Sequence, residues 1–260
     1  MNKKIIKKFF ILIIFIFSIF LCGCTFQTTG IVLPDLTGKT TAECKEILDG
    51  LNIKYQFKIY NEQYYSEKDY DKFYDYGNNL LAGRVISPDT FVYVYTTPLK
   101  LTKNYIDQVT IDFDYENKDF TDDGVGKVSL VRSVDGDTAH FTDLSGDYVK
   151  IRFLGVDTPE STKEHEPWGK AASNFTASIL TKAKEIVLYQ EEQKTDAYGR
   201  HLAFVFADGV LVNLYLVQEA YSNSTLGGKS RYFEIFTKAS IEVSKTGRRF
   251  FGELDPNFTY

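Results

Sequence analysis

The sequence predicts an α+β protein, and three observations lead to that class. Residues 127–209 hold five short runs of strand-forming residues, and tight-turn pairs such as Asp135-Gly136 and Asp208-Gly209 end two of them. A helical pattern at 168–183 follows the third strand, and two more, at 210–221 and 231–247, follow the fifth. A smaller helix-and-strand pattern precedes them all. Five strands with one inserted and two terminal helices are typical of a five-stranded β-barrel of the OB type with three helices.

The first two dozen residues differ in kind from the rest. Four lysines precede an apolar run at 9–21, which is shorter than the roughly 20 residues that a membrane-spanning helix needs. The sequence LCGC then resembles a bacterial lipobox, which implies a lipoprotein signal peptide at 1–23 and a lipid on Cys24. An uncleaved anchor or a plain secretory signal is the alternative. Either way, we expect an extracytoplasmic protein, lipid-anchored at the cell membrane or secreted.

Cysteine usage agrees with this interpretation. Once Cys24 carries lipid, Cys44 is the last cysteine of the mature chain, and it shares an apolar helix face with Ile47, Leu48 and Leu51. We expect a buried structural thiol there. The spacing supports neither a disulfide framework nor a zinc site.

Residues 24–30 are predicted as a short tether, and residues 31–98 as a small α+β module. A turn, a capped helix and a strand come first, with Thr40 or Thr41 as the helix cap and Gly50 at its end. The stretches LPDLTGKT and GRVIS resemble the PASTA module of cell-wall-facing bacterial proteins, although its proline- and glycine-containing loop before the last strand is missing. The resemblance implies peptidoglycan as a partner. A generic α+β spacer is the alternative.

Charge is distributed unevenly along the chain. Residues 25–124 hold 10 basic and 17 acidic residues, whereas residues 125–252 hold 16 of each. Residues 99–126 are acidic and rich in turn formers, and they predict a solvated linker or hairpin because their spacing does not match an EF-hand. The strongly basic surface typical of nucleic-acid binding is absent overall. Any site for a polyanion must therefore rely on locally placed cations.

Charged residues gather at predicted strand ends in the segments DGDT (135–138), IRFLGVDTPE (151–160) and TDAYGR (195–200). Asp137, Asp157 and Glu160 supply the oxygen ligands that a hard cation such as Ca²⁺ prefers. Arg152 and Arg200 supply planar guanidinium groups that bind phosphate oxygens through paired hydrogen bonds. A carboxylate outside the metal shell can act as general base toward water. This combination predicts hydrolysis of a phosphodiester.

These segments resemble the thermonuclease (staphylococcal nuclease-like) family. SVDGDT, IRFLGVDTPE, PWGKAASNF and TDAYGRHLAFVFADGVLVN occur in the family's order and spacing over residues 127–252. The resemblance implies a calcium-dependent phosphodiesterase on an OB-type barrel that cleaves DNA and RNA and leaves 3′-phosphate ends. By motif position it also implies roles: Ca²⁺ ligands at Asp137, Asp157 and the Thr158 carbonyl, phosphate binding by Arg152 and Arg200, a general base or water-orienting group at Glu160, and a substrate contact at Tyr198.

The sequence departs from the family pattern at two places. Ala197 stands where many members carry a lysine that holds a terminal phosphate. After the second predicted helix, the paired tyrosines of the best-known member are missing; possible substitutes are Tyr221 or Tyr232, with Lys229 and Arg231 able to meet the nucleic-acid backbone.

We therefore expect an exported, membrane-anchored, monomeric nuclease for DNA, RNA or both, with residues 253–260 as a C-terminal tail. Two alternatives stay open: a barrel that binds nucleic acid without cutting it, and a cell-wall-binding lipoprotein. The full set of acids and arginines favours catalysis, because a protein that only binds has no need of Glu160.

Overall fold

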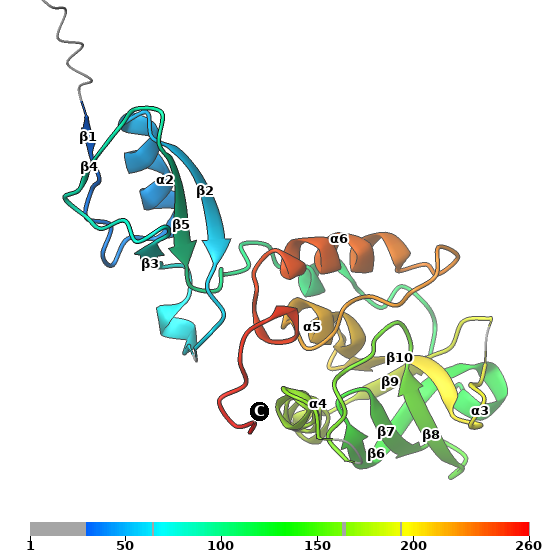
Figure 1. Ribbon diagram of the computed structural model, residues 1–260. Helices are drawn as coiled ribbons and strands as arrows, with labels where there is room; N and C mark the ends of the chain where they lie inside the picture. The colour runs from blue at the N-terminus through cyan, green and yellow to red at the C-terminus, as the bar shows by residue number, and fades with distance from the viewer. Residues whose placement is uncertain (1–29, 64, 163–164, 193, 260) are drawn as a thin grey trace, which may run out of the picture.

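The computed structural model describes residues 30–63, 65–162, 165–192 and 194–259. The chain folds into a front module (residues 31–98) and a larger barrel domain (residues 125–252) (Figure 1). Each of them has its own cluster of buried hydrophobic residues. The predicted signal peptide and Cys24 lie outside the described residues. Within those residues, no helix combines the length and the apolar character that crossing a membrane requires.

The barrel domain is built on five strands, which confirms the predicted α+β class and the OB-type barrel. They are β6 (Val125–Asp135), β7 (Thr138–Thr142), β8 (Tyr148–Phe153), β9 (Ile186–Tyr189) and β10 (His201–Ala207). In the order β6-β7-β8-β10-β9 each strand pairs with the next, and β9 pairs back with β6 to close the barrel. β8 and β10 run parallel, and the other neighbours run antiparallel.

The three expected helices are α4 (Gly169–Lys182), α5 (Val212–Gln218) and α6 (Phe233–Ser244). α4 is inserted between β8 and β9, and α5 lies against both β10 and α6 (Figure 1). The second helix begins later than predicted because a two-residue strand, β11 (Val210–Leu211), first pairs with the end of β10. A 3₁₀ turn, η3 (Arg249–Phe251), follows α6.

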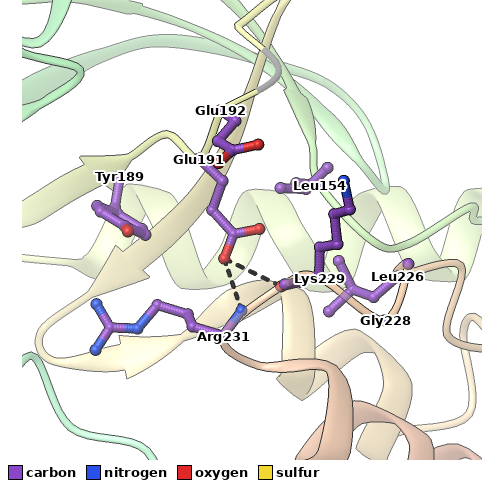
Figure 2. A pocket seen from close by; sticks show the side chains of 10 residues that line it. Leu154, Tyr189, Glu191, Glu192, Leu226, Gly228, Lys229 and Arg231 are labelled. Carbon is purple, nitrogen blue, oxygen red and sulfur yellow. Dashed lines mark hydrogen bonds between the residues drawn. The ribbon is translucent and has the colours of Figure 1, made fainter.

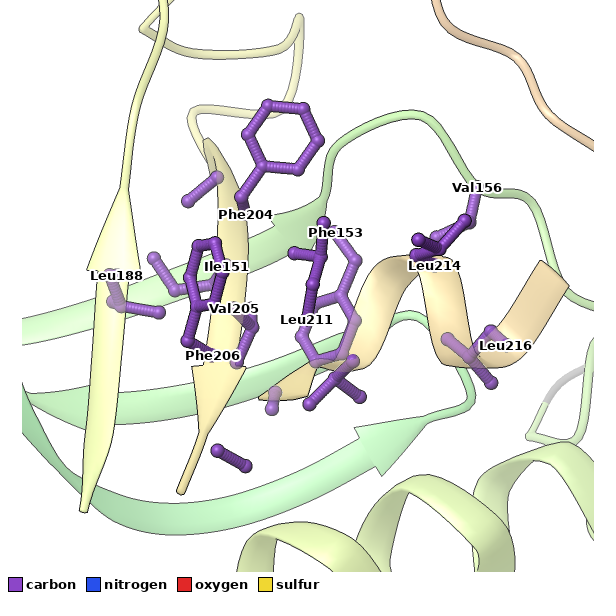
Figure 3. Close-up of a cluster of buried hydrophobic side chains, with 14 of the residues drawn as sticks. Ile151, Phe153, Val156, Leu188, Phe204, Val205, Phe206, Leu211, Leu214 and Leu216 are labelled. Atoms are coloured by element: carbon purple, nitrogen blue, oxygen red, sulfur yellow. The ribbon is translucent and has the colours of Figure 1, made fainter. Parts of the chain in front are cut away.

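Buried and less buried residues alternate along β8, whereas β10 is buried almost throughout, and the packing of the core explains this difference (Figure 3). In β8, Ile151 and Phe153 are buried in the barrel, whereas Arg152 between them is not. In β10, every residue from 203 to 207 is buried because one face fills the barrel and α5 lies against the strand. The apolar positions of β8 therefore fix which way Arg152 projects.

The segment 99–126 is more than the solvated linker that its acidic composition predicts. It contributes Tyr105, Val109 and Phe120 to the barrel core. These residues lie around a 3₁₀ turn, η2 (Ile106–Gln108), and a short helix, α3 (Phe120–Asp123), whose N-cap Asp119 accepts backbone hydrogen bonds. Single buried residues between turns follow no regular period, so pattern analysis does not detect them.

The front module contains a helix, α2 (Thr41–Gly50), and a sheet in the order β2-β5-β3. Its strands are β2 (Lys54–Ile59), β3 (Phe73–Tyr76) and β5 (Phe91–Thr96), with β2 parallel to β5; β1 (Ile31–Val32) and β4 (Val85–Ile86) form a separate antiparallel pair, and η1 (Glu67–Asp69) is a 3₁₀ turn. Thr40 and Glu43 form a capping box at the start of α2. Cys44 is fully buried as expected, and burial raises the pKa of its thiol to about 11.

The side chain of Asn213 connects α5 to the barrel through hydrogen bonds, and its contribution to stability can be tested. Its buried side chain accepts a hydrogen bond from Val205 N at 2.8 Å and donates to Leu154 O at 2.9 Å. Asn213→Ala is expected to lower the free energy of unfolding by about 1–3 kcal/mol, because it leaves buried backbone groups without partners. Urea denaturation followed by circular dichroism measures the change. The exposed Asn223→Ala is the control, with a change within about 0.5 kcal/mol; equal losses in both variants would contradict the assignment.

Candidate active site

The three charged segments converge on one cleft of about 540 Å³. The strand register brings them together: Arg152 in β8 lies opposite Thr138 of β7 on one side and Leu202 of β10 on the other. The β6–β7 turn and the residues just before β10 therefore flank Arg152. Six charged side chains line the cleft, namely Asp135, Asp137, Arg152, Asp157, Glu160 and Arg200.

Arg152 lies between two carboxylates. Its guanidinium forms an ion pair with Asp137 and another with Asp157, the latter at 2.5 Å between Nη2 and Oδ1. The Nη1 atom is buried against Asp137 but makes no aligned hydrogen bond. Arg152 thus neutralises the two acids while one of its donor nitrogens lacks a hydrogen bond of good geometry.

Asp137 is an enclosed acid of the cleft: like Asp135, it has 6% of its surface exposed. Its Oδ2 accepts hydrogen bonds from Thr158 N at 2.8 Å and Thr158 Oγ1 at 3.1 Å, and its Oδ1 accepts one from Thr138 Oγ1. Burial raises the pKa of Asp137 above its ordinary value, against the opposing effects of Arg152 and these hydrogen bonds. Thr158 thus attaches the loop after β8 to the β6–β7 turn.

Hydrogen bonds to the segment that follows α5 hold the loop that carries Asp157. Asp157 N donates to Ser222 Oγ at 2.8 Å, and Ser222 Oγ donates to Asp157 O at 3.0 Å. An isolated β-bridge joins Val156 to Ser224 beside it. The backbone at Asp157 is therefore fixed, while its side chain stays 71% exposed toward the cleft. Nothing in the sequence marks Ser222 for this role.

Glu160 lines the same cleft and lies beside Asp135. Partial burial raises its pKa above the ordinary value, and a hydrogen bond to the neighbouring Asp135 and the charge of that residue act in the same direction. Glu160 N donates to Glu166 Oε2 at 2.8 Å, and Glu160 O accepts from Glu166 N at 3.0 Å. A Cβ atom at Gly169 would lie 2.2 Å from Glu160 O, so glycine at the start of α4 is what lets this backbone pack there.

Arg200 is oriented by a residue that the sequence analysis did not single out. Its Nε donates to Asp196 Oδ2 at 2.7 Å, and its backbone N donates to Asp196 Oδ1 at 2.9 Å. Nη1 lies 3.4 Å from Thr138 Oγ1. The spacing of four residues within TDAYGR is the sequence signal for this pairing. Tyr198 does not line the cleft: it is 86% exposed, with its ring 5.7 Å from the Arg200 guanidinium.

The donor set of the cleft fits a hard cation. In the described part of the chain, no three His, Cys, Asp or Glu side chains are grouped closely enough to hold a metal by themselves. Asp137 and Asp157 nevertheless line one cleft, and the backbone N of Thr158, the third residue that the family resemblance assigns to the metal, donates to Asp137. A cation with six to eight oxygen ligands, such as Ca²⁺, takes the remainder from carbonyls, water and substrate. The residues present suit that kind of site.

A second hollow, of about 570 Å³, lies beside Leu154 (Figure 2). Lys229 and Arg231 line it, away from the catalytic cleft, and Glu191 Oε1 accepts a hydrogen bond from Arg231 N at 2.9 Å. The Arg231 guanidinium binds both carboxylate oxygens of Asp112. Tyr221 and Tyr232 are buried. Neither the two tyrosines, given above as substitutes for the missing tyrosine pair, nor Lys229 and Arg231, given as contacts to the nucleic-acid backbone, line the catalytic cleft.

Comparisons with known proteins find nucleases that are similar to the barrel domain. The family model described as staphylococcal nuclease homologue matches residues 150–242. A thermonuclease from Staphylococcus intermedius is 38% identical over 147 residues, covering 53% of this chain and 86% of that protein. A thermonuclease from Staphylococcus hyicus is 34% identical over 137 residues, covering 50% and 80% respectively. The SPbeta prophage-derived endonuclease YokF from Bacillus subtilis is 36% identical over 121 residues, covering 45% and 40%.

Proposed function

Because the chain belongs to the family of staphylococcal nuclease homologues and is a nuclease, we propose that its cleft is the centre of a calcium-dependent phosphodiesterase for DNA, RNA or both. The observation that carries this proposal is the convergence of two arginines and four acids on one cleft. Residues 125–252 have no net charge, so the phosphate must be recognised locally. Arg152 and Arg200 supply that recognition.

The proposed reaction uses the side chains that line the cleft. Arg152 and Arg200 bind oxygens of the scissile phosphate and neutralise the charge that develops there. Ca²⁺, held by Asp137, Asp157 and the Thr158 carbonyl, would add charge neutralisation and orient the attacking water. Glu160 accepts a proton from that water as its oxygen bonds to phosphorus. As the family resemblance implies, the bond to the 5′ oxygen breaks, that oxygen takes up a proton from solvent water, and the phosphate stays on the 3′ oxygen.

Two features prepare this site before substrate arrives. Asp196 and Thr138 already orient Arg200, which lowers the entropy lost when the phosphate binds. Tyr198, exposed beside Arg200, offers an aromatic face to a neighbouring base or sugar. The alternative, a barrel that binds nucleic acid without cutting it, gives no role to Glu160, which lines the cleft beside Asp135.

Chelation and one substitution test the chemistry. Removal of Ca²⁺ with EGTA is expected to stop digestion of single-stranded DNA, and the products before chelation should carry 3′-phosphate ends. Arg152→Lys should lower kcat/KM by about a hundredfold or more, because lysine keeps the charge but not the paired donors. Mass spectrometry of the fragments and initial rates give both readouts.

Arg132→Lys is the matched control, since Arg132 lies on β6 and contacts His140 outside the cleft. Digestion that continues at full rate under chelation would refute the calcium assignment. Tight binding of DNA with no cleavage by the unaltered protein would favour the non-catalytic alternative.

We also place the protein outside the cytoplasm, anchored to the membrane through Cys24; the support is the lysine-rich start, the apolar run and the LCGC sequence. Cys24→Ser in the full chain, expressed in a bacterium, is expected to shift the protein out of the detergent-soluble membrane fraction because it removes the lipid attachment point. Immunoblots of the fractions measure this. Cys22→Ser is the control and should stay in the membrane fraction. A Cys24→Ser protein that remains there would indicate an uncleaved anchor instead.

The front module offers a second function, binding of the peptidoglycan of the cell wall. On β5, Val92 and Val94 are buried, while Phe91, Tyr93 and Tyr95 alternate to the other face of the sheet. Phe91 is 48% exposed and packs edge-on against Tyr93, and Lys58 Nζ lies 3.8 Å above the Tyr93 ring. Exposed apolar faces of this kind mark binding surfaces. We therefore propose that this face contacts cell-wall glycan.

A pull-down on purified peptidoglycan tests the wall contact. Substituting Phe91→Ala and Tyr93→Ala together should reduce the retained fraction severalfold, because the exposed ring surface is lost. Tyr198→Ala removes an exposed aromatic ring from the barrel domain instead and should be retained like the unaltered protein. Equal retention of all three proteins would rule this surface out.

A further inference from the structure

The end of the chain is built into the fold, although the sequence predicts residues 253–260 as a tail. Glu253 and Asp255 are each only 3% exposed, which is unusual for carboxylates. The segment runs from the end of α6 through η3 toward the start of α4, and it meets the front module on the way (Figure 1). It therefore contacts both halves of the protein.

On the side of the front module, Tyr70 is the main contact. Its buried hydroxyl donates to both carboxylate oxygens of Glu253, at 2.6 and 2.7 Å. Arg249 N donates to the same carboxylate at 2.8 Å, and the Arg249 guanidinium binds Glu67 of the front module at 2.7 Å. The same guanidinium lies over the Tyr221 ring and contacts Glu219 of the barrel domain. Glu253 thus joins the two halves through buried hydrogen bonds.

On the side of the catalytic cleft, the contact is Trp168. Its ring Nε1 donates to Glu253 O at 2.8 Å, and its backbone N donates to Asp255 Oδ2 at 2.7 Å. Trp168 has a left-handed backbone (φ 68°), a conformation that a bulky residue adopts only when its surroundings enforce it. The hydrogen bonds from Trp168 to Glu253 and Asp255 hold its backbone in this conformation.

Trp168 stands directly before the glycine that packs on Glu160. Gly169 N donates to Glu166 O at 3.0 Å, and Glu166 in turn exchanges hydrogen bonds with the backbone of Glu160. A shift of Trp168 would therefore move the start of α4 and the backbone of Glu160 together. Proton transfer from a bound water depends on the placement of the carboxylate within a fraction of an ångström.

We propose that Trp168 is a positioning residue for Glu160, and that the front module acts on catalysis through Tyr70, Glu253 and Trp168. The inference rests on the role proposed above for Glu160. It makes the front module part of the catalytic apparatus, so a ligand that shifts Tyr70 alters turnover at the cleft.

Tyr70→Phe in the full chain tests the connection, because it removes one hydroxyl and leaves the ring. We expect kcat on single-stranded DNA to fall by about threefold to tenfold, with KM nearly unchanged, since no substrate contact is lost. Tyr76→Phe is the matched control: Tyr76 is equally buried, and its hydroxyl donates to Pro34 O inside the front module at 2.8 Å. Its kcat should equal that of the unaltered protein, and the melting temperatures of both variants are measured to check that any loss of stability is comparable.

Two further measurements separate positioning from general destabilisation. Trp168 is the only tryptophan of the chain, so its fluorescence reports on this position directly. The emission should change in Tyr70→Phe and stay the same in Tyr76→Phe. Trp168→Phe removes the Nε1 donor, and combining it with Tyr70→Phe should lower kcat no further than the more impaired single variant does, because both act along one path.

The outcomes are distinct. Unchanged emission in Tyr70→Phe overturns the connection, and changed emission with unchanged kcat overturns its effect on Glu160. Additive losses in the double variant also contradict it, because they indicate independent effects. If the unaltered protein cuts no nucleic acid, the proposed function fails, while the emission of Trp168 still reports whether Tyr70 reaches it.

Discussion

The ion pairs of Arg152 with Asp137 and Asp157 are the interaction on which the rest of the site depends. Two acids converge near the end of a barrel strand, one of them enclosed, and an enclosed carboxylate is costly unless a cation or hydrogen bonds compensate it. Arg152 provides that compensation because Ile151 and Phe153 occupy the core on either side of it. In the reaction proposed above, the same guanidinium that stabilises the acids in the free protein would become available for a phosphate once a cation neutralises their charge.

Much of this could be predicted from sequence because the informative signals are local. Alternating apolar residues identify β8, and turn pairs such as Asp135-Gly136 delimit the strands, so the barrel and the clustering of its charged strand ends follow. The positions of Asp137, Arg152 and Glu160 in one cleft depend on strand pairing that a five-stranded barrel enforces. The local sequence pattern and the closed topology of the barrel were together sufficient to predict which charged residues share the cleft.

What could not be predicted depends on contacts between distant residues. Ser222 holds Asp157, and Glu253 holds Tyr70 and Trp168, yet these are isolated polar residues in irregular segments with no periodic pattern. The sequence predicted a C-terminal tail at Glu253 and, from acidic composition, a solvated linker around Phe120, whereas specific partners bury both residues. A buried polar residue is explained by its partner, and the partner is visible only in the fold.

The parallel pairing of β8 with β10 also bears on when the protein becomes active. α4 and β9 lie between these two strands in the sequence. Arg200 therefore comes beside Arg152 only when the intervening chain has folded back and β10 has paired with β8. Long-range parallel pairing forms late because the intervening loop must first be closed. The cleft is therefore complete only when these strands have paired, and a newly made chain lacks it until the barrel closes. A chain that is still unfolded does not carry the assembled site that the proposed chemistry needs.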